Sequence, residues 1–547
     1  MEDTNIEQIE QRPGQKLQAK GYSHSGASRV KKALKSYVAS SGSAQEDIDY
    51  SNQILRERGR DLFMSSPVAR SAIRTIATNA VGTGLQLQPA IDKDKLGMTD
   101  EEADRWQKHV KDEFSLWADD KRACDSTGMN TFSKMQNLLL LSELMSGDCF
   151  VLIKNKKPSL LRPYSLRLQV VEADRVRTPT FSLTAYSTTE ARAENGNLIH
   201  DGVEVDKDGL IQAYYFANRH PGELSLESVD NPLKYVRVKA SSQKTGLPNV
   251  LHIVPTERPG QYRGVTILAP VIEELRQLQR YTDAELTAAV IEAFFTVFVK
   301  TQADPDDMPF NETDEAEFQT DPNDYALGPG QINIMKPGED LVFADPKRPA
   351  NGFDSFVGAI TTQIGAALGI PQEVLLERFN SSYSASRAAL LEAWKGFREW
   401  RKWFIDDFCT PVYEIWMSEA VARGRIEAPG FFTDPLRRKA YLSASWVGPS
   451  QGQLDPVKEV TAEILKCSEG FSTHAESTTS LNGGHWDKNI EILKVENKRM
   501  GKDGPDPHQK AEEGTQNDSQ NSEEAESQNF TNLVLNYLQS EDRKENG

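Results

Sequence analysis

The sequence contains none of the short motifs that mark nucleotide-hydrolysing or hydrolytic enzymes. There is no GxxxxGKS or GxxxxGKT phosphate loop, no GxSxG nucleophile turn and no HExxH zinc pair. Gly82 and Gly84 have no third glycine and follow an expected helix, so they do not form a dinucleotide-binding loop. We therefore expect a non-enzymatic chain with no catalytic residue set, no cofactor and no resident metal.

Cysteines are few, and long hydrophobic runs are absent. No two of the four cysteines stand in a CxxC spacing, so we expect neither a disulfide framework nor a zinc site. The most apolar stretch is interrupted by Glu285 and Glu292, which excludes a membrane span of ordinary length. The polar N-terminal residues do not resemble a signal peptide. We expect a soluble chain that is made in the cytoplasm.

Acidic residues outnumber basic ones, and the net charge is −18. A strongly acidic chain is a poor candidate for gripping nucleic acid, because affinity for phosphate grows with the cations presented. It can still border nucleic acid that slides past. The charge is uneven: the segment 16–35 holds six basic residues and no acid, and the segment 501–547 holds eleven acids and four bases. We expect a flexible basic segment at 1–45 and a disordered acidic tail at 499–547.

The stretch from Arg258 to Lys300 predicts one very long helix. A tight turn, RPGQYRG, is followed by about 35 residues without glycine, with apolar residues at spacings of three and four. Pro270 suits the first turn of a helix, where its missing N–H is no loss. We place the helix at about Val265–Val299, on the order of 45–50 Å long. Such a one-sided helix needs a long partner surface, either the core of a large monomer or neighbouring copies of the chain.

Other segments divide by pattern into helical and β-rich parts. The segment 47–80 predicts a helix with Arg56, Arg58 and Arg60 on its exposed side, and further helices are expected at Thr99–Asp119 and Thr131–Gly147. Between Cys149 and Val254, short β-branched and aromatic runs alternate with turn residues, VDKDG among them, which predicts a β-rich module with hairpins.

The second half of the chain shows helices again. They are expected at Phe353–Leu368 and about Ser384–Ala422, the latter tryptophan-rich and kinked at Pro411. One or two helices should lie within 434–498. The acidic segment 304–315 suggests either a solvated loop or a metal site, but an EF-hand needs glycine where Pro309 stands.

Five segments resemble the portal proteins of tailed bacteriophages, specifically the lambda-type group. In chain order they are SPVARSAIRTIATNAVGTGLQLQ; SGDCFVLI with VVEADRV; GVEVDKDGLIQAYYF; VLHIVPTERPGQYRGVTILAPVIEELRQLQRYTDAELTAA; and GIPQEVLLERFNSSYSASRAALLEAWKGFREWRKWF. They span roughly Ser43 to Lys498. One departure concerns Arg378 and Phe379, which stand where the family often has Asp-Tyr or Asp-Leu before the asparagine.

The resemblance implies a mixed α+β portal fold assembled as a ring, with the chain divided into named parts. The expected parts are the basic N-terminal segment 1–45, a wing at 46–260, a stem helix at 261–300, a clip at 301–350, a second stem helix at 351–374, a tunnel loop at 375–385, a long tryptophan-rich wing helix at 386–433, a helical crown at 434–498 and the acidic tail.

Two sets of site residues follow from this resemblance. The tunnel-loop candidates for contact with DNA are Arg378, Asn380, Ser381, Ser382 and Tyr383. The alternative is that Arg378 pairs with Glu373 or Glu377 and the serines cap the next helix. The candidates for packing between neighbouring stem helices are Leu268, Ile272, Leu275, Leu278, Leu286 and Val290.

The implied function is that of a ring, typically of twelve copies, at one vertex of the capsid of a virion. Double-stranded DNA would be packaged and ejected through it without sequence specificity. The implied partners are the terminase large subunit, a head–tail connector protein, and the major capsid and scaffold proteins, with no membrane. Two alternatives remain open at this point: a nuclease that binds metal through the acids at 304–315, and a helical scaffold protein without a channel.

Overall fold

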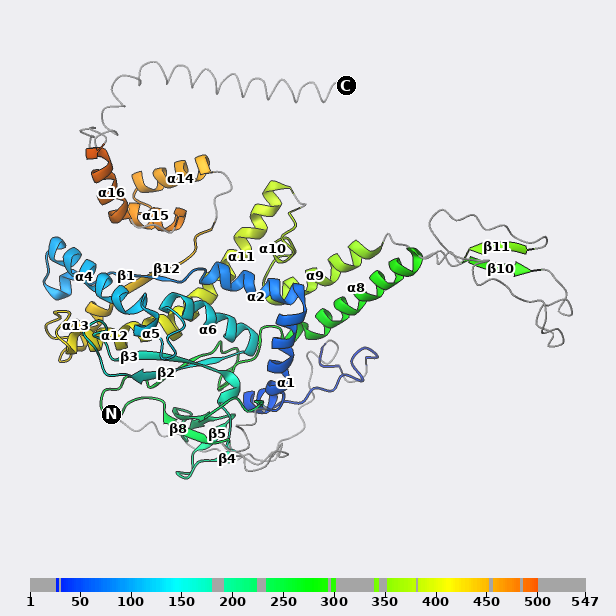
Figure 1. Ribbon diagram of the computed structural model, residues 1–547, viewed down its shortest axis with the longest axis horizontal. Helices are drawn as coiled ribbons and strands as arrows, with labels where there is room; N and C mark the ends of the chain where they lie inside the picture. The colour runs from blue at the N-terminus through cyan, green and yellow to red at the C-terminus, as the bar shows by residue number, and fades with distance from the viewer. Residues whose placement is uncertain are drawn as a thin grey trace, which may run out of the picture. The chain divides into compact units, whose positions relative to one another are not determined.

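The computed structural model describes residues 26–28, 31–179, 191–223, 233–293, 297–301, 339–343, 352–379, 382–451, 456–482 and 486–499. The chain divides into two compact units. Unit 1 is formed by Met1–Ala77 and Asp112–Pro429, and unit 2 by Thr78–Lys111 and Gly430–Gly547. Helices and antiparallel strands both contribute (Figure 1), which confirms the mixed α and β class.

The first helices begin and end where the sequence provides caps. They are α1 (Ala44–Ser65), α2 (Pro67–Ala80), α4 (Asp100–Ala118), α5 (Lys121–Cys124) and α6 (Phe132–Ser146). Ser43 and Glu46 form a capping box at the start of α1. Thr131 accepts the Lys134 N–H at the start of α6, and Gly147, with φ of 92°, ends it. Arg56 is buried, so its predicted place on the exposed side of α1 is wrong.

Two antiparallel sheets form the β-rich module, as predicted. The first has the order β3 (Leu166–Glu172), β2 (Cys149–Asn155), β9 (Val250–Ile253). The second runs β4 (Ala191–Arg192), β5 (Leu198–His200), β6 (Val203–Val205), β7 (Ile211–Ala217), β8 (Tyr235–Lys239). Phe150 and Val171 of the first sheet share one apolar cluster with Val205, Tyr214 and Phe216 of the second. The sheets therefore have a common core.

A second core is aromatic and joins α4, α6 and α12 (Thr410–Ala422). The Phe114 ring lies edge-on to Phe132 and Trp416, with ring centroids 5.6 and 5.0 Å away. Trp117 donates its indole N–H to the Leu166 carbonyl, 3.0 Å away, which ties this core to β3. Of the tryptophans in the tryptophan-rich stretch, Trp394 and Trp416 are buried, whereas Trp403 is 40% exposed.

The predicted long helix is shorter than expected. A 3-10 turn at Ala269–Val271 leads into α8 (Ile272–Ala293), and β10 (Val297–Thr301) then pairs with β11 (Glu339–Phe343). The prediction of helix to Val299 was wrong because Val297, Phe298 and Val299 are β-branched or aromatic residues that favour a strand once a partner strand is available.

Three further helices of unit 1 follow. The first, α9 (Phe353–Leu368), has the predicted bounds and ends at Gly369, whose φ is 67°. The short α10 (Gln372–Leu375) comes next. The long helix after it is α11 (Tyr383–Phe404), which continues through a π-helical turn at Ile405–Cys409 into α12. This turn stands beside Pro411, where the sequence predicted a kink.

Unit 2 joins segments from both halves of the chain. β1 (Gln86–Pro89) pairs antiparallel with β12 (Ala444–Val447), and α3 (Lys93–Leu96) contacts α13 (Pro435–Leu442). The unit also contains α14 (Pro456–Ser468), α15 (His474–Asn482) and α16 (Trp486–Arg499), so it holds more helices than the one or two expected there. None of the helices described is long and apolar enough to span a bilayer.

Candidate functional site

The RPGQYRG turn before α8 is held from several sides. Within the turn, the Gln261 side-chain amide accepts the Arg258 N–H, 3.2 Å away, and donates to the Arg263 carbonyl, 2.9 Å away. Arg258 forms an ion pair with Asp47 of α1. The Tyr262 hydroxyl donates to the Gly209 carbonyl in the β6–β7 turn, 3.0 Å away. These contacts fix the turn against both α1 and the β-rich module.

Arg263 is the centre of a buried group of charged residues. Its Nε and Nη2 donate to the two carboxylate oxygens of Asp148, at 2.7 and 3.2 Å, in a bidentate pair. Its Nη1 donates to the Asp201 carboxylate, 2.8 Å away, and to the Val176 carbonyl at the same distance. We call the residues of this group the anchor cluster: Arg56, Asp148, Asp201, His252 and Arg263.

Asp148 is fully buried and stays ionised. Burial alone would raise the pKa of Asp148, but the charges of Arg263 and Arg56 and a hydrogen bond with His252 hold it well below its usual value. The His252 ring nitrogen lies 3.4 Å from the Asp148 carboxylate. Burial lowers the pKa of His252 in spite of that carboxylate. The Asp148 carboxylate also accepts the Gly264 N–H, 3.0 Å away.

A third acid, Asp49 of α1, lies near the anchor cluster and behaves differently. Burial and the Asp201 carboxylate raise the pKa of Asp49 from 3.8 to about 7, although Arg263 and Arg56 partly oppose this shift. With Asp49 protonated, the two arginines face two ionised aspartates, so the charges in the group balance. Ionising Asp49 would add an uncompensated negative charge.

Three glycines allow the backbones around the anchor cluster to touch. A Cβ added to Gly264 would lie 1.8 Å from the Gly147 carbonyl oxygen, closer than any real Cβ contact. A Cβ on Gly59 of α1 would lie 2.6 Å from the Met145 carbonyl oxygen. The Asn52 side chain donates to the Gly264 carbonyl, 2.9 Å away. The start of α8 is therefore locked to α1 and to the α6–β2 turn.

The contacts of the anchor cluster serve to hold the fold. The donors of Arg263 are satisfied by carboxylates and carbonyls of the chain itself, so Arg263 directs no donor at a ligand. A fully hydrogen-bonded buried network fixes one geometry and tolerates little change. The anchor cluster therefore sets the direction in which α8 leaves the β-rich module.

Along α8 the apolar residues fall into two groups. Leu268, Leu275 and Leu278 are buried within the chain itself, and Ile272 is partly buried. Leu286 is 66% exposed, and the side chain of Val290 lies outside the described residues. Tyr281 contacts Phe353 and Phe356 of α9, with ring centroids 5.7 and 4.5 Å away, so α8 and α9 pack together (Figure 1).

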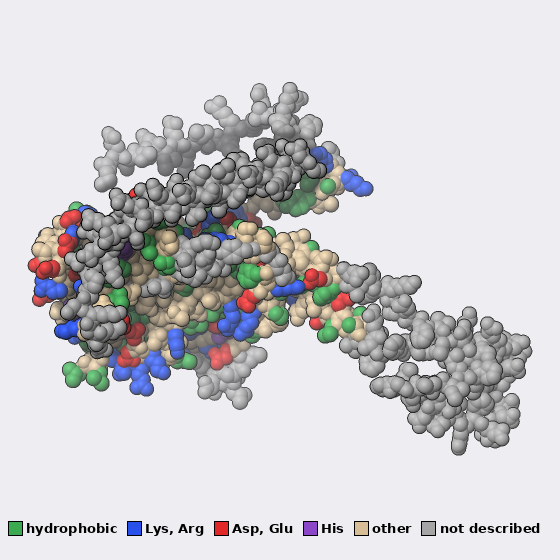
Figure 2. Space-filling model, turned by 90° about the horizontal axis from the view of Figure 1, so that it is seen from above, with side chains coloured by type: hydrophobic (Ala, Val, Ile, Leu, Met, Phe, Trp, Pro, Cys, Tyr) green, Lys and Arg blue, Asp and Glu red, His purple; other side chains and the backbone are tan. Residues whose placement is uncertain are grey.

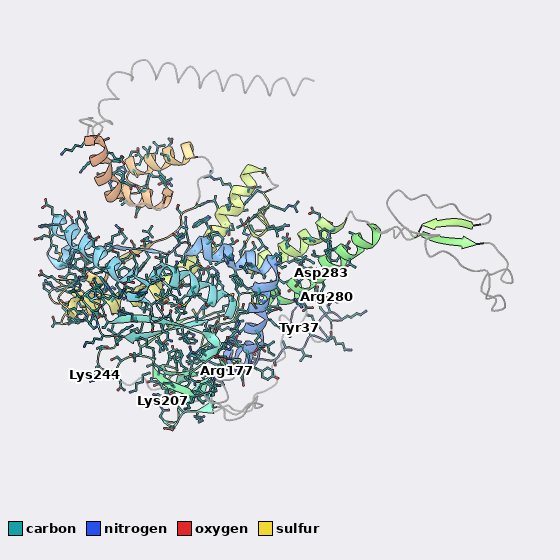
Figure 3. All side chains as sticks on the ribbon, viewed as in Figure 1. Tyr37, Arg177, Lys207, Lys244, Arg280 and Asp283 are labelled. Carbon is teal, nitrogen blue, oxygen red and sulfur yellow. The ribbon has the colours of Figure 1, made fainter. Side chains whose placement is uncertain are left out.

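Charged residues also lie on the exposed side of α8. Arg280 and Asp283 lie on this helix (Figure 3), and both are exposed. More widely, Lys and Arg side chains occur among Asp and Glu side chains on the face of the molecule seen in Figure 2. A surface of mixed sign does not bind a polyanion as strongly as a basic patch of the same size.

The segment after α9 contains the predicted tunnel-loop residues. Arg378 forms an ion pair with Asp354 of α9 at 3.1 Å, and both side chains are well exposed. It is this acid, and not Glu373 or Glu377, that pairs with Arg378. Ser382 caps α11 by accepting the Ala385 N–H, 3.4 Å away. Asn380 and Ser381 lie outside the described residues, as does the side chain of Tyr383.

Sequence reasoning singled out RPGQYRG but missed the residues that hold it. Asp148, Asp201 and Arg56 come from three distant segments, and no spacing links them to Arg263. One signal was present: Asp148 follows a glycine and directly precedes the apolar run CFVLI. An acid at the start of a buried strand needs a partner, which a search for orphan charges would have flagged.

The acidic segment 304–315, where the sequence allowed a metal site, lies outside the described residues. Among the residues that the structure does describe, no group of three or more His, Cys, Asp or Glu could hold a metal ion. All four cysteines, Cys124, Cys149, Cys409 and Cys467, are described and free.

Comparisons with known proteins point in one direction. A family model described as phage portal protein, lambda family, matches residues 31–401. Portal protein B of Escherichia phage lambda is 23% identical over 437 residues, which cover 76% of this chain and 78% of that protein. The probable portal protein of Halomonas phage phiHAP-1 is 25% identical over 448 residues, which cover 81% of this chain and 79% of that protein.

Solved structures give weaker likenesses. One comes from the neck of a native gene transfer agent particle, with a TM-score of 0.43 and 13% identity over 79% of this chain and 93% of that chain. Another comes from the virion of a native gene transfer agent particle, with a TM-score of 0.42 and 14% identity over the same shares.

Proposed function

The chain belongs to the lambda family of phage portal proteins, and from that membership we propose that its copies form the ring-shaped channel at one vertex of the capsid. Members of this family are structural components of tailed-phage virions and not enzymes, and this chain is one of them. Double-stranded DNA enters the capsid through the proposed channel during packaging and leaves through it during ejection. The observation that carries the proposal is the family match over residues 31–401.

The paired helices α8 and α9 support a ring. Their contact through Tyr281 leaves Leu286 of α8 and Phe356 of α9 substantially exposed. A neighbouring helix pair packed against these two side chains would remove their apolar surface from water. In the proposed ring of twelve copies, this helix pair is the stem and Leu286 packs against a neighbour. Leu268, Leu275 and Leu278 serve the fold of the single chain instead.

The segment 375–385 is the proposed tunnel loop, with Arg378, Asn380, Ser381, Ser382 and Tyr383 as the candidates for contact with DNA. Arg378 already has a partner in Asp354, so its charge is partly compensated before DNA arrives. A compensated cation in a wall of mixed sign attracts phosphate only weakly. DNA can slide along such a wall without being held.

The remaining parts of the proposal concern partners. The clip at 301–350, most of which lies outside the described residues, is the proposed docking site for the terminase large subunit and a head–tail connector protein. The terminase supplies the ATP hydrolysis that drives DNA. Major capsid and scaffold proteins surround the ring in the shell. The nuclease alternative has no support in a family of structural proteins.

The mass of the purified full-length chain tests the ring directly. Native mass spectrometry should give particles near twelve times 61.1 kDa, and negative-stain images should show a central hole. The measurement should be repeated with scaffold and capsid proteins present, since closure can depend on them. A chain that remains monomeric under both conditions would rule out the ring.

A further inference from the structure

The connection between β2 and β3 ends in a tight, well-formed hairpin tip. Ser159 and Arg162 exchange two backbone hydrogen bonds, at 2.9 and 3.1 Å, and so enclose Leu160 and Leu161 as the two residues of the turn. Neither leucine has a positive φ, so this turn does not need the Asn, Asp or Gly that the hairpin turns with left-handed residues require. Its backbone accepts most residue types and does not by itself select leucine.

Both leucines lie in solvent. Leu160 is 99% exposed and Leu161 is 80% exposed, the highest and one of the next highest values among the large apolar side chains described. Exposing a leucine forgoes the free energy that its burial would contribute. A pair of adjacent leucines at a projecting turn is thus typical of a contact that the single chain does not complete.

The tip is also held in place. Arg162 forms an ion pair with Asp120 at 2.7 Å, and the Lys156 N–H donates to the Ser165 carbonyl at 2.8 Å. At the base of the hairpin, the Glu419 carboxylate of α12 accepts the backbone N–H groups of Ser165 and Leu166, at 2.6 and 2.9 Å. A contact element that is ordered before it binds loses less conformational entropy on binding.

The surroundings of the leucines are basic. Residues 154–162 contain four basic residues and no acid, in a chain whose net charge is −18. Lys154, Lys156 and Lys157 are exposed, and none of them makes an ion pair with another described residue. Only Arg162 is compensated, by Asp120. The partner that fits this surface is acidic and offers an apolar depression.

We propose that Leu160 and Leu161 insert into the acidic surface of a neighbouring copy of this chain, with Lys156 and Lys157 paired to its carboxylates. A second copy fits because the chain as a whole is strongly acidic and the tip is a local exception. Two leucines also cover far less than the roughly 800 Å² per partner of a stable interface, so the tip works only where other contacts already hold the copies together. The inference rests on the proposed ring.

A dilution experiment on full-length rings tests the contact. The variant Leu160→Ser/Leu161→Ser should dissociate at a protein concentration at least about tenfold higher than the unchanged protein, since it loses two buried leucines. Leu210→Ser is the matched control, because Leu210 is a 65% exposed leucine in another turn of the same module. This control should change the midpoint by less than about twofold. Thermal unfolding would verify that both variants fold.

Cross-linking identifies the occupant. Rings are assembled from an equal mixture of ¹⁵N-labelled and unlabelled chains and treated with a carbodiimide, which joins lysine amines to carboxylates. Linked peptides that contain Lys156 or Lys157 and combine one heavy and one light chain would support the contact between copies. Links within single chains only, or an unchanged dissociation midpoint, would overturn it and leave the ring intact.

Two other results would also decide against the inference. A chain that never forms rings would overturn both the ring and the contact. Binding of the unchanged protein to vesicles that contain phosphatidylglycerol, lost in Leu160→Ser/Leu161→Ser while ring stability stays the same, would show that the tip contacts a membrane instead.

Discussion

The two ion pairs at the ends of the α8–α9 region are built in opposite ways. Before α8, Arg263 and Asp148 are fully buried, and the Val176 and Ala173 carbonyls and the Gly264 N–H add hydrogen bonds to the pair. After α9, Arg378 and Asp354 are 59% and 85% exposed and make one contact at 3.1 Å. Both are arginine–aspartate pairs, but the difference in burial determines how strongly each pair fixes the local geometry.

The comparison shows which part of the geometry a single chain fixes by itself and which part can change when the chain binds another molecule. A buried pair fixes a geometry, because losing either partner leaves a charge without water or counter-charge. An exposed pair can exchange its partner for water, salt or another molecule at little cost. The buried pair therefore fixes the direction of α8 within the single chain. The exposed pair leaves Arg378 able to bind another molecule in place of Asp354.

The strongest test of this contrast removes the buried arginine. Arg263→Met keeps much of the side-chain volume but leaves the buried Asp148 and the partly buried Asp201 without their main counter-charge. The free energy of unfolding should fall by about 3–5 kcal/mol. Thermal unfolding would measure the loss, and hydrogen exchange of residues 258–268 would show that it is centred on the turn before α8.

The matched control is Arg378→Met, which makes the same substitution in the exposed pair and should change the free energy of unfolding by about 0–1 kcal/mol. Adding Asp148→Asn to Arg263→Met should recover part of the loss, because it removes the stranded charge. Equal effects of the two arginine substitutions would mean that burial does not distinguish the pairs.

The second test addresses the backbone contact beside the buried pair. Gly264→Ala places a Cβ 1.8 Å from the Gly147 carbonyl oxygen, so one of the two segments must move. We expect a loss of about 3 kcal/mol in the free energy of unfolding. Gly396→Ala is the control, since nothing lies within 4 Å of its added Cβ and it stands inside helix α11. That variant should be unchanged or slightly more stable.

Helix ends, turns and strands could be predicted from the sequence where residues close together in the chain determine them. The segment Phe353–Leu368 forms a helix with its predicted bounds, ended by Gly369, and the VDKDG turn forms with Asp206 accepting the Leu210 N–H. The strands of the β-rich module were also expected from their β-branched and aromatic runs.

Strand pairs and ion pairs between residues far apart in the sequence could not be predicted from it. The strand Val297–Thr301 pairs with Glu339–Phe343, and Gln86–Pro89 pairs with Ala444–Val447, across long intervals of sequence. Periodicity alone extended α8 into the first of these strands. Arg56 was placed in solvent because its counter-charges, the buried Asp148 and the partly buried Asp201, lie far along the chain. No local pattern reports such a pairing.

A third test uses pH to change the charge balance near the buried pair. Asp49 has a pKa of about 7 in the folded chain and about 3.8 when unfolded, so the folded state binds more protons between these values. The stability associated with protonated Asp49 is therefore present below pH 4 and lost as pH rises through 7. Asp49→Asn removes this loss and should gain about 2 kcal/mol over the unchanged protein at pH 8, after allowance for the partial exposure of Asp49.

The readout for Asp49 is a difference between two proteins, because other acids titrate in the same range. Thermal unfolding of Asp49→Asn and of the unchanged protein should agree near pH 4 and diverge steadily toward pH 8. Asp61→Asn, an exposed aspartate of the same helix, should show no such divergence. A constant difference at every pH would mean that Asp49 does not carry the charge balance of the anchor cluster.

The smallest effect on folding is expected at the far end of α8. Leu286→Asp exchanges a 66% exposed side chain and should change the free energy of unfolding of the single chain by less than about 0.5 kcal/mol. In the proposed ring it should nevertheless prevent assembly, because the new charge would be buried against a neighbour. Light scattering and native mass spectrometry would measure assembly, and circular dichroism would measure the fold.

Leu275→Asp makes the same change in the first turn of α8, where the side chain is buried within the chain. It should unfold the region around α8 before assembly is reached, so both fold and ring are lost. The two leucines thus separate folding from assembly along one helix. If Leu286→Asp formed normal rings, the far end of α8 would not belong to the proposed interface. If Leu275→Asp gave a folded monomer, the face of α8 that carries Leu275 would be needed for assembly and not for the fold of the single chain.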